Sequence, residues 1–284
     1  MNKIGIINGL SHTEIIMKDD KVFFIESGAR AGGDFIGDVL IKLSTNYDYY
    51  KNAIDVALGQ FKYSKFKNKN HCGVYFLCKQ TNYLKPLFSM AKDSKWLYEL
   101  KNIDKITEKK ANDDGGSSGY LIYSSDHKIT LRDYPFKAEC INKRKAALDM
   151  LIDFNKNIGR HISDTELKVG MKKFIEKGNV ITIIYDNQII AMANLYCNNY
   201  ETKEAYLNNV EVMKDYRGYG LSKLLIEKAF SIVKENNFNI IKLDVEEDNY
   251  VAVRLYEKYG FKFTDNYKQI GELTTREMIF RIGD

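Results

Sequence analysis

The chain has 284 residues, of which 44% are hydrophobic and 29% are charged. This length suits two domains of ordinary size, and the composition excludes a disordered or fibrous protein. No run approaches the roughly 18 apolar residues of a membrane-spanning helix. The first residues, Met1–Leu10, lack the basic region, apolar core and cleavage site of a signal peptide. We therefore expect a cytoplasmic protein without a membrane partner.

The formal net charge of +5 raises the question of nucleic-acid binding. One short segment interleaves lysines with aromatic residues, namely Phe61, Lys62, Tyr63, Lys65, Phe66, Lys67 and Lys69. Lysine is abundant along the whole chain, and a lysine run is usually a solvated face, so we do not expect a nucleic-acid partner. The cysteines show no zinc-ligand spacing, and we interpret all of them as packing residues: Cys72, Cys78, Cys140 and Cys197.

The first informative stretch lies near the N-terminus. It consists of the run Gly9–Glu14, an apolar segment Val22–Glu26 that predicts a short strand, and the glycine-rich Ser27–Gly33. Together these segments resemble the end of the active site of ATP-grasp ligases. The resemblance implies an N-terminal α+β domain like the C-terminal part of an ATP-grasp fold.

In ATP-grasp ligases two acidic residues on neighbouring strands hold magnesium against the ATP phosphates, and an arginine contacts the phosphates. Glu14, Glu26 and Arg30 match these positions, and their residue types suit a hard cation and a phosphate. Gly28 departs from the pattern, because many relatives carry an asparagine ligand there. The resemblance runs only from about Asn2 to about Ile129, without the family's substrate domain, nucleotide-cradling loop and upstream lysines.

We therefore expect a truncated domain that is reused structurally, in which Glu14 and Glu26 are vestigial metal candidates and Mg-ATP is not a ligand. Its use as a dimerisation element, as a substrate-capture element or as half of a split ligase with a separate partner chain stays open. A further alternative is a bifunctional ligase and acetyltransferase whose start lies upstream of Met1.

Two breaks follow in the chain. Asn112–Gly119 is a loop by composition and precedes a possible strand, Tyr120–Tyr123, while Asp133–Pro135 forms the second break. After Pro135 the apolar spacing becomes helical. We therefore predict domains at residues 1–135 and 136–284.

The second domain alternates helices and strands. Helical spacing predicts one helix through Ala146, Ala147, Met150, Leu151 and Phe154 that ends near Gly159, a second over Asp164–Glu176 closed by Gly178, and a third over Leu221–Glu235. Strands are predicted at Val180–Tyr185, Ile189–Cys197, Ala205–Val212 and Ile240–Val245, and near Phe261 and Met278. A last helix is capped by Asp248 or Asn249 and ends at Gly260. The pattern is that of an α/β domain with mixed strands.

A glycine-bearing turn, Arg217–Ser222, joins the predicted strand Ala205–Val212 to the long helix. Without side chains at Gly218 and Gly220 the backbone can approach a ligand closely, and the N–H groups of the first helical turn point toward it. Such a helix start favours an anion such as a pyrophosphate. A tight connection without a ligand is the alternative.

The spacing Arg-x-x-Gly-x-Ser in this turn, preceded by Asn209–Val212, resembles the acyl-CoA loop of the GNAT superfamily of N-acetyltransferases. Asn249–Phe261 resembles the superfamily's second CoA segment, in the same order and separation. Ser222 departs slightly, because relatives usually carry glycine or alanine there. The resemblance covers about Cys140 to the C-terminus. It implies a mixed sheet flanked by helices, acetyl-CoA as cosubstrate, and these binding residues: Val210, Val212, Arg217, Gly218, Tyr219, Gly220, Leu221, Ser222, Asn249 and Tyr256.

The chemistry needs an acid for the leaving thiolate and a path for the amine's proton. Tyr256 matches the family tyrosine, and a phenol with a pKa near 10 is protonated at neutral pH; a core aromatic residue is the alternative. Glu211, with Asn209 expected on the same strand face, is our candidate for holding a proton-relaying water; a solvated glutamate is equally compatible. The resemblance also implies that the Val212 amide polarises the acetyl carbonyl.

These expectations combine into an N-acyltransferase that moves an acetyl group from acetyl-CoA to a primary amine of a small molecule through a ternary complex. The alternative is a non-catalytic chain, or the complementing half of a split ATP-grasp carboxylate-amine ligase. A homo-oligomer is compatible with either function.

Overall fold

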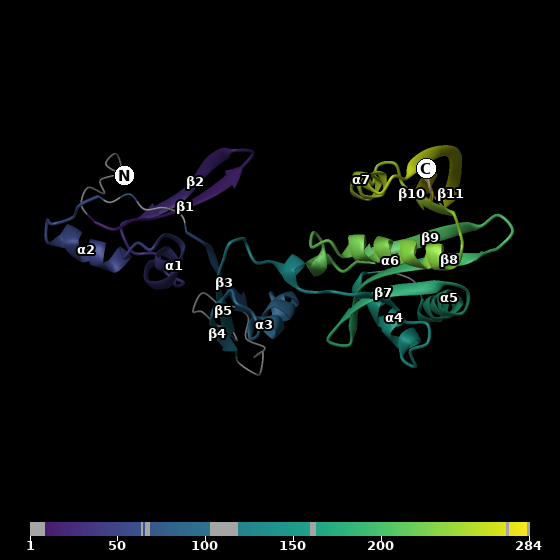
Figure 1. Ribbon diagram of the computed structural model, residues 1–284, viewed down its shortest axis with the longest axis horizontal. Coiled ribbons are helices and arrows are strands. Elements are labelled where there is room, and N and C mark those ends of the chain that lie inside the picture. The colour runs from purple at the N-terminus through teal and green to yellow at the C-terminus, as the bar shows by residue number, and fades with distance from the viewer. Residues whose placement is uncertain are drawn as a thin grey trace. The chain divides into compact units, whose positions relative to one another are not determined.

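The computed structural model describes residues 9–63, 65, 69–102, 119–159, 163–270 and 273–282. The chain divides into two compact units, Met1–Tyr134 and Pro135–Asp284 (Figure 1). The predicted loop before Gly119, together with Phe66 and Lys67 of the lysine-rich segment, lies outside the described residues. No described helix is long and apolar enough to cross a membrane.

The N-terminal unit begins with a two-stranded antiparallel hairpin, β1 (His12–Lys18) and β2 (Lys21–Gly28). Its turn residues Asp19 and Asp20 both have positive φ, the conformation of tight two-residue hairpin turns. The predicted apolar strand Val22–Glu26 is present within β2. The apolar side chains of both strands are exposed, with Phe24 of β2 63% exposed and Met17 of β1 70% exposed.

The rest of this unit contains short helices and a three-stranded antiparallel sheet in the order β3-β5-β4. Its elements are the π-helix Ile36–Leu40, α1 (Ile41–Thr45), α2 (Tyr49–Ala57), β3 (His71–Leu77), α3 (Lys85–Ala91), β4 (Leu97–Asn102) and β5 (Gly119–Ser125). A small core forms where the apolar residues of α3 and β5 are buried, including Leu87, Leu121 and Ile122.

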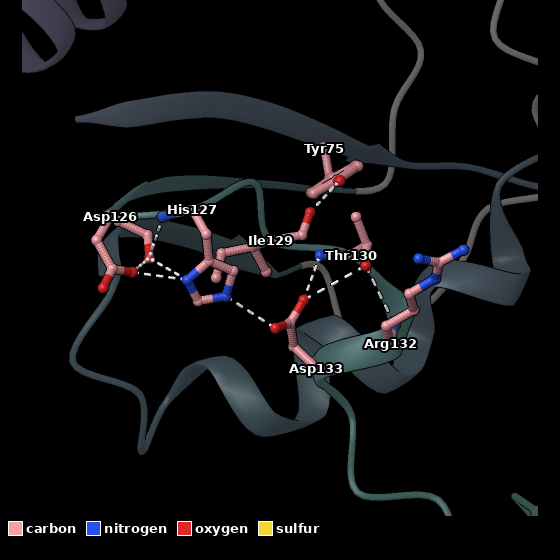
Figure 2. A network of polar contacts seen from close by, with 8 residues as sticks. Tyr75, Asp126, His127, Ile129, Thr130, Arg132 and Asp133 are labelled. Atoms are coloured by element: carbon pink, nitrogen blue, oxygen red, sulfur yellow. Dashed lines mark hydrogen bonds and ion pairs between the residues drawn. The ribbon is translucent and has the colours of Figure 1, made fainter. Parts of the chain in front are cut away.

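After β5 a polar network holds the end of the N-terminal unit (Figure 2). The His127 ring lies between two carboxylates, with Nδ1 2.6 Å from Asp126 Oδ1 and Nε2 2.9 Å from Asp133 Oδ1. Asp133 Oδ2 in turn accepts from the Thr130 N–H at 2.7 Å, which completes a capping box on the short 3-10 helix Leu131–Asp133.

The C-terminal unit is built on a seven-stranded sheet in the order β11-β12-β10-β9-β8-β7-β6, antiparallel except for the parallel pair β9 and β10. The strands are β6 (Ala138–Cys140), β7 (Asn179–Tyr185), β8 (Gln188–Asn199), β9 (Glu204–Val212), β10 (Ile240–Val245), β11 (Lys262–Ile270) and β12 (Leu273–Arg281). The mixed α/β architecture expected from the sequence is confirmed for this unit.

Helices cover both faces of this sheet (Figure 1). They are α4 (Ala147–Asn157), α5 (Asp164–Lys177), α6 (Leu221–Glu235) and α7 (Tyr250–Lys258). One face packs against α4 and α5 in a core that includes Leu151, Phe154 and Met192. The other packs under α6, whose buried stripe of Leu225, Ala229 and similar residues follows the helical period.

Two sequence-based expectations are wrong in detail. Asn209 does not share a strand face with Glu211: it has φ +52°, and Asn208 and Glu211 pair with Asn194 and Met192 across β8, so β9 carries one extra residue between them. Such a β-bulge breaks the period-two alternation on which the expectation was based. Likewise, Cys140 is exposed on the edge strand β6 rather than packed.

Candidate active site

The two parallel strands at the middle of the sheet separate toward their C-terminal ends. The β9–β10 pairing runs from Glu204 with Ile240 to Tyr206 with Lys242, and among the described residues it extends no further. Beyond that point β10 still pairs with β12, while β9 contains the bulge at Asn209. The result is a gap between neighbouring strands, directly before the turn into α6.

The backbone of Val212 lies at one edge of this gap. Met213 donates its N–H to Ile190 of β8 at 2.9 Å. Because successive residues of a strand direct their N–H groups to opposite sides, the N–H and C=O of Val212 point away from β8, toward the gap. The Val212 carbonyl accepts a 3.0 Å hydrogen bond from Arg217 Nε, which ties the loop back to the strand.

The loop into α6 depends on two glycines in left-handed conformations, Gly218 with φ +80° and Gly220 with φ +86°. A Cβ placed on either glycine meets no atom within 4 Å, so the backbone conformation and not protein packing requires glycine there. The space beside the loop is open. The first N–H groups of a helix have no carbonyl partner one full turn earlier in the helix; that of Lys223 donates to the Gly220 carbonyl at 3.0 Å. A ligand phosphate can therefore approach the backbone.

A pocket with a volume of about 710 Å³ lies beside this loop, within the size range of small-molecule sites. Its walls come from β9, from the loop and first turn of α6, and from α7. The lining residues are Ile158, Val210, Glu211, Val212, Tyr216, Arg217, Gly218, Gly220, Leu221, Ser222, Asn249, Val251, Ala252, Leu255 and Tyr256.

Tyr256 is the buried polar residue of the α7 wall, with 8% of its surface exposed. Burial raises its pKa to about 12, since the interior disfavours the phenolate. Tyr256 is therefore a protonated phenol across the neutral range. Asn249 has a structural role at the start of the same helix, because its side-chain oxygen accepts from the Ala252 N–H at 3.3 Å and caps α7.

The structure brings nearly all of the sequence-predicted site residues to this one pocket. Tyr219 is the exception, because it is not among the lining residues, and Asn209 lies in the bulge. The sequence reasoning missed five lining residues: Ile158, just after α4, and Tyr216, Val251, Ala252 and Leu255. A sequence signal existed for Val251, Ala252 and Leu255, because they belong to the segment Asn249–Phe261 that resembles the second CoA segment.

The sequence-predicted metal candidates belong to the N-terminal unit, whereas the pocket residues belong to the C-terminal unit. Glu14 and Glu26 face each other as register partners across β1 and β2. Arg30 donates to the Ala31 carbonyl at 3.1 Å. Among the described residues no group of three or more His, Cys, Asp or Glu side chains is arranged to hold a metal ion.

Comparison with known proteins points to one family for the C-terminal unit. Residues 150–261 match the model of the acetyltransferase (GNAT) family. The ribosomal protein bS18-alanine N-acetyltransferase of Haemophilus influenzae is 38% identical over 85 residues, which cover 30% of this chain and 56% of that protein. The probable N-acetyltransferase san of Drosophila melanogaster is 27% identical over 99 residues, covering 34% and 53%.

The chain thus spans about half the length of the curated relatives it matches. Among solved structures, an acetyltransferase of the GNAT family from Streptococcus pneumoniae superposes with a TM-score of 0.44 at 18% identity, over 52% of this chain and 99% of that one.

Proposed function

We propose, from the premise that residues 150–261 form a GNAT acetyltransferase domain, that this chain transfers an acetyl group from acetyl-CoA to an amine. One observation carries the proposal: the left-handed Gly218–Gly220 loop, the start of α6 and the buried Tyr256 converge on a single pocket. The loop and helix start suit the pyrophosphate of the cosubstrate. The acetyl thioester then lies in the gap between β9 and β10.

In the proposed reaction the amine nitrogen attacks the thioester carbon, a C–N bond forms and the C–S bond breaks. The Val212 N–H, which points into the gap, donates a hydrogen bond to the carbonyl oxygen as negative charge develops there. Tyr256 gives its phenolic proton to the leaving thiolate, and the amine's proton passes to a water held at Glu211. Both reactants are held together, so no covalent enzyme intermediate forms.

The raised pKa of Tyr256 suits the role of an acid. With a pKa of about 12 the phenol keeps its proton until the thiolate forms. Because Tyr256 is buried, bulk water does not take over its role as proton donor. Glu211 lines the same pocket from β9.

The acceptor is proposed to be a primary amine, either of a small molecule or of a protein N-terminus. The sequence favours a small molecule because of the ligase-like N-terminal segment. Similarity to a ribosomal protein alanine N-acetyltransferase and to an N-alpha-acetyltransferase favours a protein α-amine. The acceptor amine is selected by loops that vary freely on one fold.

The test is a thermal-stability and turnover experiment on the full chain. Acetyl-CoA is expected to raise the melting temperature in proportion to ln(1 + [L]/Kd). Release of free CoA thiol is then followed with two acceptors, a peptide with a free N-terminal alanine and 1,4-diaminobutane. The proposal is contradicted if acetyl-CoA neither stabilises the chain nor yields thiol with either acceptor.

A second candidate function, the complementing half of a split ligase, is favoured by the β1–β2 hairpin. Glu14 and Glu26 are directly opposite each other, an arrangement that repels unless a cation lies between the carboxylates. The hairpin also exposes large apolar side chains of both strands, Ile15, Ile16, Met17, Val22, Phe23, Phe24 and Ile25. Stabilisation by Mg-ATP in the same thermal experiment supports this candidate.

A further inference from the structure

The β1–β2 hairpin of the N-terminal unit has two open edges. Its strands form a sheet by themselves, and no other described strand pairs with either of them. In Figure 1 the turn end of the hairpin extends away from α1 and α2. A sheet of two strands is marginally stable in water, and the unpaired N–H and C=O groups of an edge are a template for another strand. The hairpin is therefore a sheet that a further strand can extend.

The two edges differ in their regularity. The register of the hairpin shifts between Glu14 and Ile15, where β2 contains one extra residue, Ile25. Such a bulge disturbs the alternation of side chains and protects an edge against further pairing. β1 contains no extra residue, so its side chains alternate regularly from Glu14 to Lys18. The β1 edge is thus the one that suits a new strand.

The charged side chains of the hairpin are arranged in like pairs. Glu14 is opposite Glu26 at one end, and Lys18 is opposite Lys21 beside the turn. All of these side chains are exposed, and none of them makes an ion pair with another described residue. Like charges directly opposite each other destabilise a sheet. The hairpin by itself therefore contains two repulsive pairs, the glutamate pair and the lysine pair.

The charges along β1 are complementary to those of a second, antiparallel β1. Glu14 lies two residues before Ile16, and Lys18 lies two residues after it. If two copies of β1 pair about Ile16, Glu14 of each copy is opposite Lys18 of the other. Ile15 of each copy is then opposite Met17 of the other. Because side chains alternate with a period of two, the opposed residues lie on the same face in every pair.

The direction of the backbone groups agrees with this pairing. Residues that flank a two-residue hairpin turn pair through hydrogen bonds, and here these residues are Lys18 and Lys21. Because successive residues direct their N–H and C=O groups to opposite sides of a strand, we expect Met17 and Ile15 to direct theirs to the open edge. Ile15 of one copy and Met17 of the other are therefore able to exchange backbone hydrogen bonds.

We propose that β1 pairs with β1 of a second copy of this chain about a two-fold axis at Ile16, so that the two hairpins form a four-stranded sheet and the chain is a homodimer. The lysine pair of each hairpin then lies beside the glutamate pair of the other and supplies the positive charge that this pair lacks. The assembly closes at two copies, because the bulge in β2 protects the outer edges. The dimer does not depend on the proposed acetyl transfer.

The test is analytical ultracentrifugation of the full chain over a dilution series. The wild-type chain is expected to sediment as a dimer that dissociates on dilution. Glu14→Lys and Lys18→Glu are each expected to raise the dimer Kd at least about tenfold, because each change makes two attractive pairs repulsive. Each change also removes a like-charge pair within the hairpin, so a lost dimer does not reflect a destabilised hairpin. Lys95→Glu, which changes an exposed lysine of the same unit, is the matched control and is expected to leave the Kd within twofold.

Two combinations separate the proposed pairing from a general effect of charge. An equimolar mixture of the Glu14→Lys and Lys18→Glu variants is expected to form heterodimers as tightly as the wild-type chain, because each copy presents the opposite charge to the other. The double variant is expected to form homodimers for the same reason. A wild-type chain that is monomeric at every concentration, a dimer that both single variants leave intact, or failure of either combination to associate overturns the proposal.

Oxidative cross-linking tests the register of the pairing. Ile16→Cys is expected to form an intermolecular disulfide, because the two-fold axis places this position opposite itself at the distance that a disulfide spans. Ile15→Cys lies on the other face, opposite Met17, and is expected to cross-link no more than the wild-type chain, whose own cysteines set the background. Cross-linking of Ile15→Cys that equals or exceeds that of Ile16→Cys overturns the proposed pairing.

Discussion

Arg217 Nε donates a 3.0 Å hydrogen bond to the carbonyl oxygen of Val212, five residues earlier in the chain. This contact closes the loop between β9 and α6 and fixes the Val212 peptide at the edge of the strand gap. Arg217 therefore holds the loop in position, a role that is separate from binding a phosphate.

Replacing Arg217 with alanine is expected to weaken acetyl-CoA binding about tenfold, because the loop loses its tie to β9 and the pocket loses a positive charge; tenfold corresponds to about 1.4 kcal/mol. Calorimetric titration with acetyl-CoA measures the change. Lys223→Ala, which removes an exposed cation from the first turn of the neighbouring helix α6, is the control. Equal affinities for the two variants contradict the assignment of Arg217.

Gly220→Ala is expected to lower both acetyl-CoA affinity and stability. The φ of +86° costs an L-residue roughly 1–2 kcal/mol, although nothing in the chain contacts the new methyl group. Gly170→Ala, at an equally open position within α5, is expected to stabilise the chain by about 0.5–1 kcal/mol. Urea unfolding of both variants provides the comparison, and destabilisation of the two by equal amounts refutes the argument.

Tyr256→Phe is expected to lower turnover by about 10²–10⁴-fold, the usual contribution of a general acid. The Kd for acetyl-CoA should stay within twofold of the wild-type value, because the phenylalanine ring still fills the same buried position. Since the pKa of Tyr256 is raised to about 12, no loss of activity from its deprotonation is expected below about pH 10. Unaltered turnover in Tyr256→Phe assigns the acid role to another group.

The His127 network predicts a pH optimum for the stability of the N-terminal unit. Hydrogen bonds to Asp126 and Asp133 raise the pKa of His127. The hydrogen bond from His127 lowers the pKa of Asp126. For Asp133, burial opposes the shift, but hydrogen bonds from Thr130 and His127 lower its pKa.

The His127 contribution is complete below its unfolded pKa of about 6.5 and is lost as the pH rises through the raised folded value. The aspartate contributions are complete above about pH 3.9 and are lost as the pH falls through the lowered folded values. Stability should therefore be greatest between about pH 4 and pH 6.5. Fluorescence of Trp96, the chain's one tryptophan, reports this unit, and His127→Gln should remove the decline above pH 6.5.

Gly178→Ala is expected to destabilise the C-terminal unit by about 1–3 kcal/mol, the usual cost of overpacking a core. A Cβ at Gly178 lies 2.4 Å from Oδ1 of Asn194, which is completely buried. The φ of −118° shows that packing, and not backbone conformation, requires this glycine. Chemical denaturation tests the value, and adding Asn194→Ala should make the two effects non-additive.

Some features of this protein follow from the sequence alone. The apolar period of Leu221–Glu235 predicts α6 with the bounds that the structure has, and Asn249 caps α7 as its residue type indicates. The placement of Gly218 and Gly220 before a helix start likewise indicates an anion-binding turn. These signals are local: helical periodicity, capping and left-handed turns depend on residues within one or two turns of the chain.

Tertiary structure decided the rest. The bulge at Asn209, the direction of the Val212 N–H and the 2.7 Å hydrogen bond from the Tyr206 hydroxyl to Asp244 Oδ2 all depend on which strand lies beside β9 and where their pairing ends. Tyr206 and Asp244 are 38 residues apart in the chain. Strand register is set by long-range pairing, which no local pattern of Ala205–Val212 or Ile240–Val245 encodes, so only the folded sheet decides which of these groups meet.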